Sequence, residues 1–242
     1  MVQQEWPIWL YGPSKGIDLW RELYAKYNLI PFPGALSGPE FGFFTNKPLG
    51  TLDDFKGMRL RTPGMGADVL KELGAVPVVL PQGEIMNALK QGKIDGFEFG
   101  APAVDWGLGF DNKITPYVTL PSWHQPSAMY EVFVNKDAWN KLPDDLKDIF
   151  EAACKEVSMV DFPAKLEGVN AEYQRQYEQG GMQVSVLDTA TMQRISEITN
   201  KLADAQAAQN VFYARVLKSQ RDFKVDYRTW EKWSDFKVYP SN

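Results

Sequence analysis

The sequence predicts an α/β fold with a parallel sheet, on the basis of three observations in residues 51–99. Short apolar runs alternate with runs whose apolar residues have helical spacing. Glycine or proline separates the runs, as is typical at the ends of helices and strands. The resulting order of strand, helix, strand, helix, strand is the unit of parallel sheets, which bind ligands beyond the carboxyl ends of their strands.

The elements of this unit can be assigned in chain order. Thr51 and Asp54 form a capping box that starts a helical turn, and Gly57 ends it. We predict three strands, at residues 58–61, 76–80 and 94–99. The two helices between them should span residues 65–73 and 84–91. Arg61 then ends the first strand, and Glu98 lies near the end of the third. Both side chains should therefore lie at the ligand-binding edge of the sheet.

Further elements flank this unit on both sides. Before it we predict a strand at residues 8–11 and a helix at residues 16–27. An extended piece at residues 30–33, a loop of small residues at 34–42 and a strand at 43–44 should follow. After it we predict strands at residues 118–120, 130–135 and 182–187. One helical stretch should span residues 143–179. Pro163 should kink or break this helical stretch, because proline removes a backbone hydrogen bond.

A long helix is expected to close the chain, from residue 188 or 189 to about Asp222. Its apolar residues recur at intervals of seven or fourteen positions and include Ile195, Leu202, Val216, Ile198, Ala205 and Phe212. Such a seam packs across a domain or against a partner subunit. Packing of the helix on the chain's own sheet is an equally good interpretation.

Composition narrows the class of protein. With 44% hydrophobic and 13% aromatic residues among 242, the chain can bury a core and is not a disordered protein. A net charge of −5 argues against nucleic acid or an anionic membrane as a partner. Cys154 and His124 are the sole residues of their types, which excludes an internal disulfide and a His-rich metal site. No phosphate-binding loop or nucleophile elbow occurs, which disfavours an enzyme.

Several residues could form a binding site. Arg61 can grip a carboxylate through two parallel hydrogen bonds, or it can pair with an acid on the surface. Glu98 lies in an otherwise apolar strand, so it must be paired, protonated or bound to a cation. Glu98 and Glu40 together would suit Ca²⁺ or Na⁺, although a buried ion pair and a solvated loop acid are simpler interpretations. His124 is either a general base or a structural residue.

Longer stretches of the sequence resemble the substrate-binding proteins of TRAP transporters. The resemblance is carried by LDDFKGMRLRTPG at residues 52–64 and by three further stretches, at 75–85, 88–96 and 133–143. Taken together these motifs are quite specific. They imply a two-lobe fold of the periplasmic-binding-protein type with the ligand between the lobes. Family members carry further residues ahead of the region of Trp6, so we expect a truncated N-terminal lobe.

The resemblance also divides the chain into three parts. Residues 1–60 are expected to be the remainder of the N-terminal lobe, and residues 61–135 the second α/β lobe. Residues 136–242 would form a helical segment that crosses back over the lobes. Within that segment, residues 189–222 are the candidate dimer helix.

Within the family, the chain is most similar to the branch that binds 2-oxo or 2-hydroxy monocarboxylates together with a cation. The resemblance implies that Arg61 clamps the ligand carboxylate, while Glu98 and the carbonyl group of Phe99 hold Ca²⁺ or Na⁺. In that branch Gln, Trp and Glu usually occupy the positions of Glu40, Phe99 and Gln125. The exchange of an acid and an amide between Glu40 and Gln125 would keep the total charge. A Phe in place of a Trp removes a ring N–H and widens the pocket, which leaves the preferred acid and cation open.

Two sets of site residues follow from these arguments. The expected ligand-binding residues are Arg61, Phe99, Glu40, Trp123 and His124. The expected cation-binding residues are Glu40, Glu98, Phe99 and Gln125.

The resemblance thus implies a periplasmic solute-binding protein that presents a small organic acid to TRAP membrane subunits and performs no covalent chemistry. A homodimer through the C-terminal helix is compatible with this function. Two alternatives stay open. One is a cation-dependent enzyme that acts on oxo acids, with Glu98 or His124 as its base. The other is a truncated fragment that binds no ligand.

Overall fold

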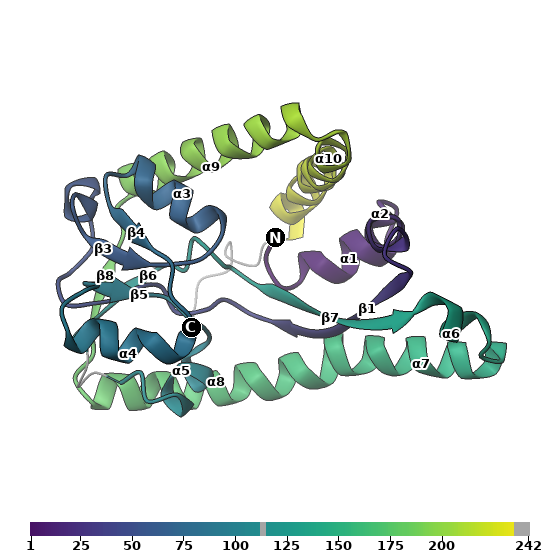
Figure 1. Cartoon of the computed structure of the whole chain (residues 1–242), viewed down its shortest axis with the longest axis horizontal. Coiled ribbons are helices and arrows are strands. Elements are labelled where there is room, and N and C mark those ends of the chain that lie inside the picture. Colours follow the sequence, from purple (N-terminus) through teal and green to yellow (C-terminus); the bar gives the residue numbers. More distant parts are fainter. Residues whose placement is uncertain (112–114, 235–242) are drawn as a thin grey trace.

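The computed structural model describes residues 1–111 and 115–234, and it contains two sheets (Figure 1). The larger sheet has six strands in the order β4-β3-β5-β2-β6-β8. Its parallel part consists of the strands β3 (Arg59–Arg61), β4 (Val76–Val78) and β5 (Gly96–Phe97). Two helices connect these strands, α3 (Met65–Glu72) and α4 (Gln82–Lys90). The predicted α/β unit with a parallel sheet is therefore confirmed, and the turn Leu52–Phe55 before it carries the predicted capping box.

The rest of the larger sheet is mixed in direction. The short strand β2 (Phe44–Thr45) runs antiparallel to both β5 and β6 (Tyr117–Leu120). The strand β8 (Gln183–Val186) lies parallel beside β6 at the edge. These strands come from three distant parts of the sequence.

A long two-stranded ribbon forms the second sheet. It pairs β1 (Leu29–Ser37) antiparallel with β7 (Ala128–Asn135), and a β-bulge lies between Pro33 and Ala35. Figure 1 shows the ribbon running away from the larger sheet, with α7 and α8 alongside. The predicted loop of small residues at 34–42 is therefore partly wrong, because β7 pairs with the backbone as far as Ser37.

The N-terminal segment forms two helices, α1 (Glu5–Tyr11) and α2 (Gly16–Ala25). The predicted strand at residues 8–11 is wrong. The rings of Trp6 and Trp9, three residues apart on α1, meet edge to face with centroids 6.0 Å apart. Trp9 also donates a hydrogen bond to Ser219 Oγ at 3.1 Å, so long-range packing decides between helix and strand in this short apolar run.

Five further helical segments cover the larger sheet and the ribbon. They are α5 (Pro102–Gly107), α6 (Lys136–Asn140), α7 (Asp144–Glu156), a π-helical turn at Val157–Asp161, and α8 (Phe162–Gln179). We predicted a kink or break at Pro163, and the structure has this π-helical turn immediately before α8, the helix that contains the proline. The chain stays helical through this turn, so the helical stretch does not end at Pro163.

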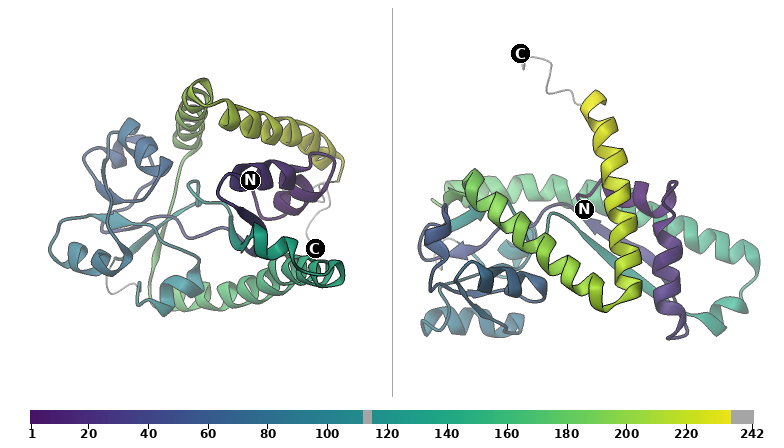
Figure 2. Two further views of the ribbon diagram at one scale, coloured as in Figure 1. Left: turned by 45° about the vertical axis from the view of Figure 1, so that its right-hand side comes forward. Right: turned by 90° about the horizontal axis from the view of Figure 1, so that it is seen from above.

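The C-terminal segment forms two helices, α9 (Thr189–Gln209) and α10 (Val211–Ser234), where we predicted one. Asn210 separates them because its backbone is extended, with φ −138° and ψ 108°. Its side chain accepts a hydrogen bond from the backbone N–H of Tyr213 at 3.0 Å and so caps α10. The two helices meet at a corner (Figure 2).

Much of the expected helical seam is covered by the chain itself. Ile195 and Ile198 are buried with Leu60 and Leu70 in the core on one side of the larger sheet. Val216 packs with Trp9 in a separate cluster near the N-terminus. Packing on the chain's own core, one of the two interpretations left open, accounts for these residues.

Two clusters of buried side chains form the core of the larger sheet. Phe43 belongs to the cluster that includes α3 and α9, whereas the next residue, Phe44, belongs to the cluster that includes α4 and α8. The alternation of side chains along a strand explains this division. Figure 1 shows these two pairs of helices on opposite sides of the sheet. No helix within the described ranges is long and apolar enough to cross a membrane.

An ion pair between Arg59 and Asp95 holds β3 to the start of β5. The Arg59 backbone N–H and side-chain Nε each donate to Asp95 Oδ2 at 2.9 Å, and Nη2 donates to Oδ1 at 2.7 Å. These hydrogen bonds lower the pKa of Asp95 from 3.8 to about 2. The contribution of the pair to stability is therefore complete above pH about 4 and is lost as the pH falls through about 2.

We expect Asp95→Asn to flatten the dependence of the free energy of unfolding on pH between about 4 and about 2. Urea unfolding, followed by circular dichroism at a series of pH values, measures this dependence. Asp53→Asn, at an exposed acid, is the matched control and should leave the slope as in the wild type. Equal slopes in all three proteins would contradict the role of the Arg59–Asp95 pair.

Candidate functional site

The candidate site lies at the carboxyl ends of β3 and β5. Arg61 is the last residue of β3, and Glu98 immediately follows β5. The parallel register pairs Arg61 with Phe97, and the Glu98 backbone N–H donates to the Arg61 carbonyl oxygen at 3.2 Å. The two charged residues that the sequence places at strand ends are thus neighbours in space.

The Arg61 side chain is held in a fixed position. Its Nη1 donates to the Glu98 carbonyl oxygen at 2.8 Å and to Glu98 Oε1 at 3.2 Å, and its Nε donates to the Leu80 carbonyl oxygen at 3.1 Å. The guanidinium carbon lies 5.7 Å from the centre of the Phe99 ring. Within the described part of the chain, Nη2 makes no hydrogen bond. This nitrogen is the donor that a bound anion could use.

Glu40 reaches the site from the loop after β1. The Phe41 N–H donates to the Gly100 carbonyl oxygen at 2.9 Å, and the Glu40 N–H donates to the Gln125 carbonyl oxygen at 3.3 Å. A Cβ atom at Gly42 would collide with the Thr119 carbonyl oxygen, so this close approach of loop and strand requires glycine. The loop is therefore fixed between the strand ends and the connection from β6 to β7.

That connection supplies His124 and Gln125. His124 Nε2 lies 3.4 Å from Glu40 Oε2 and 3.4 Å from Glu98 Oε2, and all three side chains are 5% exposed. The Gln125 side-chain amide donates a hydrogen bond to Glu40 Oε1. The Phe43 ring packs against the imidazole at a tilt of 53°, with ring centres 5.3 Å apart. The two glutamates and the histidine thus converge from three separate segments.

The electrostatics of this cluster reflect its burial. Burial raises the pKa of Glu40 above its ordinary value, although His124 acts in the opposite direction. Burial also disfavours a charged imidazole at His124, but the Glu40 and Glu98 carboxylates outweigh it and raise the His124 pKa. Each group is therefore more easily protonated than it would be in water.

Asp105 on α5 is a buried acid that the sequence interpretation missed. Burial, together with the charge of Glu40, raises its pKa to about 8. Neither carboxyl oxygen makes a hydrogen bond of good geometry to any described residue. The sequence did offer a signal for this buried acid, since Asp105 stands between Val104 and Trp106 in a short helix.

The structure brings most of the expected site residues together. Arg61, Glu98, Glu40, His124 and Gln125 form the connected group described above, and the Phe99 ring lies against Arg61. Trp123 lies beside this group, because its ring meets the His124 imidazole edge to face with centres 5.7 Å apart and also stacks on Phe43 with centres 6.1 Å apart. The binding roles of these residues stay predictions.

The donor atoms of the cluster fit a metal ion. Glu40, Glu98 and His124 each offer one ligand atom, and these atoms all lie within 4.8 Å of one another. Glu40 Oε2 and both His124 nitrogens are buried without a hydrogen-bond partner among the residues that the structure describes. Buried polar atoms are almost always paired, so Glu40 Oε2 and His124 Nε2, which lie 3.4 Å apart, indicate a ligand between them.

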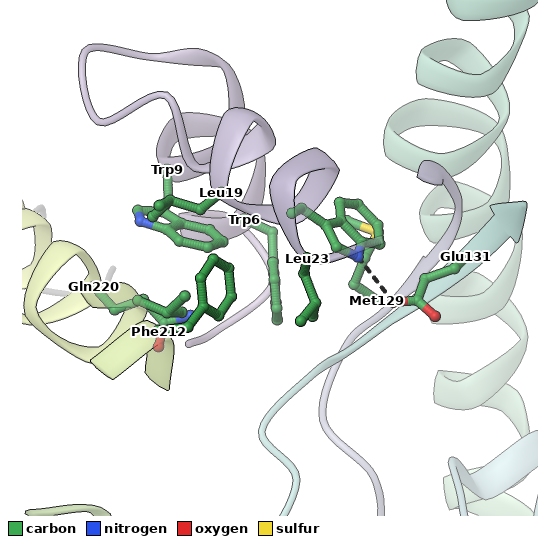
Figure 3. Close-up of a pocket in the computed structure, with 10 residues that line it drawn as sticks. Trp6, Trp9, Leu19, Leu23, Met129, Glu131, Phe212 and Gln220 are labelled. Carbon is green, nitrogen blue, oxygen red and sulfur yellow. Dashed lines mark hydrogen bonds between the residues drawn. The ribbon is translucent and has the colours of Figure 1, made fainter. Parts of the chain in front are cut away.

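An apolar pocket lies away from this cluster, between α1, α2, β7 and α10 (Figure 3). It has a volume of about 160 Å³. Its charged lining residue, Glu131, accepts a hydrogen bond from Trp20 Nε1 at 3.0 Å. Because that carboxylate is already engaged, the pocket offers little chemistry for a polar ligand.

Comparison with known protein families gives a match over most of the chain. The family model described as "Bacterial extracellular solute-binding protein, family 7" (DctP) matches residues 38–210. A monocarboxylate 2-oxoacid-binding periplasmic protein of Nostoc sp. is 30% identical over 231 residues. The match covers 96% of this chain and 62% of the Nostoc protein, so the chain spans less than two thirds of that relative's length.

Two solved structures show the same fold. A TRAP periplasmic solute-binding protein of Pseudoalteromonas atlantica with bound sodium and pyruvate is 29% identical, with a TM-score of 0.86. The likeness covers 99% of this chain and 73% of that one. A TRAP transporter solute-binding protein of Bordetella bronchiseptica is 31% identical, with a TM-score of 0.87. The likeness covers 96% of this chain and 68% of the Bordetella chain. It is a mixed-occupancy dimer with copurified calcium and picolinate in one active site. The expected fold of the TRAP solute-binding type is confirmed.

The Arg61–Glu98 pair should make the site sensitive to single substitutions. We expect Arg61→Met to lower the free energy of unfolding by about 3–5 kcal/mol, because the buried Glu98 carboxylate then lacks the positive charge of the Arg61 guanidinium. Adding Glu98→Gln to the same chain should recover most of the loss. Urea unfolding of both variants measures the effect.

Arg194→Met, at an exposed pair with Glu197, is the control and should change stability by less than about 1 kcal/mol. A double variant as unstable as Arg61→Met alone would show that packing, and not the unpaired charge, causes the loss.

Proposed function

This chain belongs to the bacterial extracellular solute-binding proteins of family 7, and from this membership we propose that it acts as a TRAP-transporter receptor for a small organic acid. The proposed ligand is a 2-oxo or 2-hydroxy monocarboxylate that binds together with a cation. The proposed location is the periplasm, where the relative from Nostoc also belongs by its description.

One observation carries the proposal. A fixed guanidinium, with one nitrogen that no described residue engages, stands directly beside a cluster of two carboxylates and an imidazole. Arg61 would bind the carboxylate of the acid, while Glu40 and Glu98 would hold the cation. A second donor atom next to the carboxylate, such as the oxygen of a 2-oxo or 2-hydroxy group, would then complete the coordination of that cation. Pyruvate and picolinate, found in the two solved structures, each carry such a second donor atom beside the carboxylate.

The proposed receptor performs no covalent chemistry. The described relatives are transport proteins, and lobe closure over the acid would present a surface to the membrane subunits. The cation-dependent enzyme and the non-binding fragment are the competing hypotheses. Conversion of a bound oxo acid to product would favour the enzyme, and a folded chain that binds no acid would favour the fragment.

Isothermal titration calorimetry with pyruvate, lactate and longer oxo acids, with and without Ca²⁺, tests the proposal. We expect binding that requires the cation and that weakens about 100-fold in Arg61→Ala, because each lost charged hydrogen bond is worth about 1.5–3 kcal/mol. Arg61→Lys should lose about tenfold, since it keeps the charge and replaces the planar guanidinium with a flexible ammonium group.

The exposed Arg194→Ala is the matched control and should bind as the wild type does. Circular dichroism confirms that each variant is folded before titration. Wild-type affinity in both Arg61 variants would remove this residue from the binding site.

We further propose that the protein forms a homodimer through α10. The Bordetella neighbour is a dimer, and α10 exposes large apolar side chains, including Val225 and Trp233. Exposed apolar surface of this kind is typical of an interface. The buried residues of α9, Ile195 and Ile198, are already covered by the chain's own core.

Size-exclusion chromatography with light scattering tests the dimer. We expect Val225→Glu, at a residue that is 67% exposed, to yield monomers without unfolding the protein. Ile149→Glu on α7, at a residue that is 64% exposed, is the matched control and should leave the dimer intact. Dimers that survive Val225→Glu combined with Trp233→Glu would rule out α10 as the interface.

A further inference from the structure

We propose that His124 is a side-chain ligand of the cation and that the site therefore prefers a first-row divalent metal ion such as Zn²⁺ to Ca²⁺ and Na⁺. The inference rests on the cation site of the proposed function. It differs from the expectation drawn from the sequence, in which Gln125 ligates the cation and His124 contacts the organic acid.

The geometry of the three side chains supports a metal between them. His124 Nε2 lies 3.4 Å from one oxygen of Glu40 and 3.4 Å from one oxygen of Glu98. A tetrahedral ion with bonds of about 2.0–2.1 Å separates its ligand atoms by about 3.3–3.4 Å. The longer bonds of Ca²⁺ also fit this separation, so the identity of the metal depends on the donor atoms.

An ion pair without a metal explains the contacts less well. A hydrogen bond between a charged imidazole and a carboxylate would close to about 2.7–2.9 Å. In the described part of the chain, His124 Nε2 and Glu40 Oε2 have no hydrogen-bond partner although both are buried. A metal ion at the common point would satisfy both atoms at once.

The donor set selects the class of metal. Imidazole nitrogen suits Zn²⁺ and its first-row neighbours, whereas Ca²⁺ and Na⁺ prefer oxygen ligands alone. Two glutamates and one histidine leave a coordination position for a bound acid. A divalent ion also balances charge, because it and Arg61 together neutralise Glu40, Glu98 and the acid's carboxylate. A monovalent ion would leave one negative charge buried.

Gln125 has a different part in this arrangement. Its amide N–H donates to Glu40 Oε1, which leaves Glu40 Oε2 as the atom that faces His124. A partner that orients a metal-binding carboxylate in this way is a common outer-shell feature of metal sites. We therefore assign Gln125 as a positioning residue and His124 as the ligand.

Metal titrations of the full chain, stripped with a chelator, test the inference. We expect Zn²⁺ and Co²⁺ to bind at least about 100-fold more tightly than Ca²⁺ by calorimetry. Bound Co²⁺ should show the intense visible absorption of a four-coordinate ion, which shifts when an organic acid is added. His124→Gln should weaken Zn²⁺ at least about tenfold and leave Ca²⁺ unchanged. Glu131→Gln, at an acid outside the site, is the control and should bind all metals as the wild type does.

Tighter binding of Ca²⁺ than of Zn²⁺ by the wild type would overturn the inference, and this result does not depend on whether any variant folds. Unchanged Zn²⁺ binding in a folded His124→Gln protein would overturn it as well. The organic acids are titrated separately with Ca²⁺ and with Zn²⁺. Acid binding with Ca²⁺ alone would refute the metal preference and keep the receptor, whereas His124-dependent Zn²⁺ binding without acid binding would refute the receptor and keep the metal site.

Discussion

The buried pair of Arg61 and Glu98 is the interaction on which the rest of the site depends. Either charge alone would be costly in this environment, and each is tolerated because the other lies across the parallel strands. Their contacts also fix the ends of β3 and β5 relative to each other. The same arrangement holds the guanidinium and the carboxylate rigid and leaves one guanidinium nitrogen without a partner among the described residues. Rigid groups of this kind lose little conformational entropy when they bind a ligand.

The two-stranded ribbon supplies the remaining donors. Its register pairs Ser37 with Ala128, so the segments that continue from these residues lie side by side. Glu40 is carried by one of these segments, and His124 and Gln125 by the other. The hydrogen bond from the Glu40 N–H to the Gln125 carbonyl oxygen extends this pairing to the site itself. The architecture thus delivers two more ligand atoms to the carboxyl ends of the parallel strands.

The acid at residue 40 and the amide at residue 125 act as a unit. Their side chains bond directly, so one carboxylate oxygen is taken by the amide and the other is turned toward His124. With a glutamine at residue 40 and a glutamate at residue 125, the site would carry the same charge. The carboxylate would then come from the segment between β6 and β7, and no longer from the loop after β1. Total charge therefore does not distinguish one divalent ion from another, and in the proposed site the atoms that would face the ion decide between them.

The sequence by itself determined the α/β unit at residues 51–99, because its periodicity and capping residues are local, and it placed Arg61 and Glu98 at strand ends. Its motifs also identified the family. Only the tertiary structure decided that residues 8–11 are helical, that Asn210 divides the C-terminal helix, and that His124 faces two glutamates. These outcomes depend on packing between segments far apart in the chain, such as Trp9 against Ser219, and local patterns carry no information about such contacts.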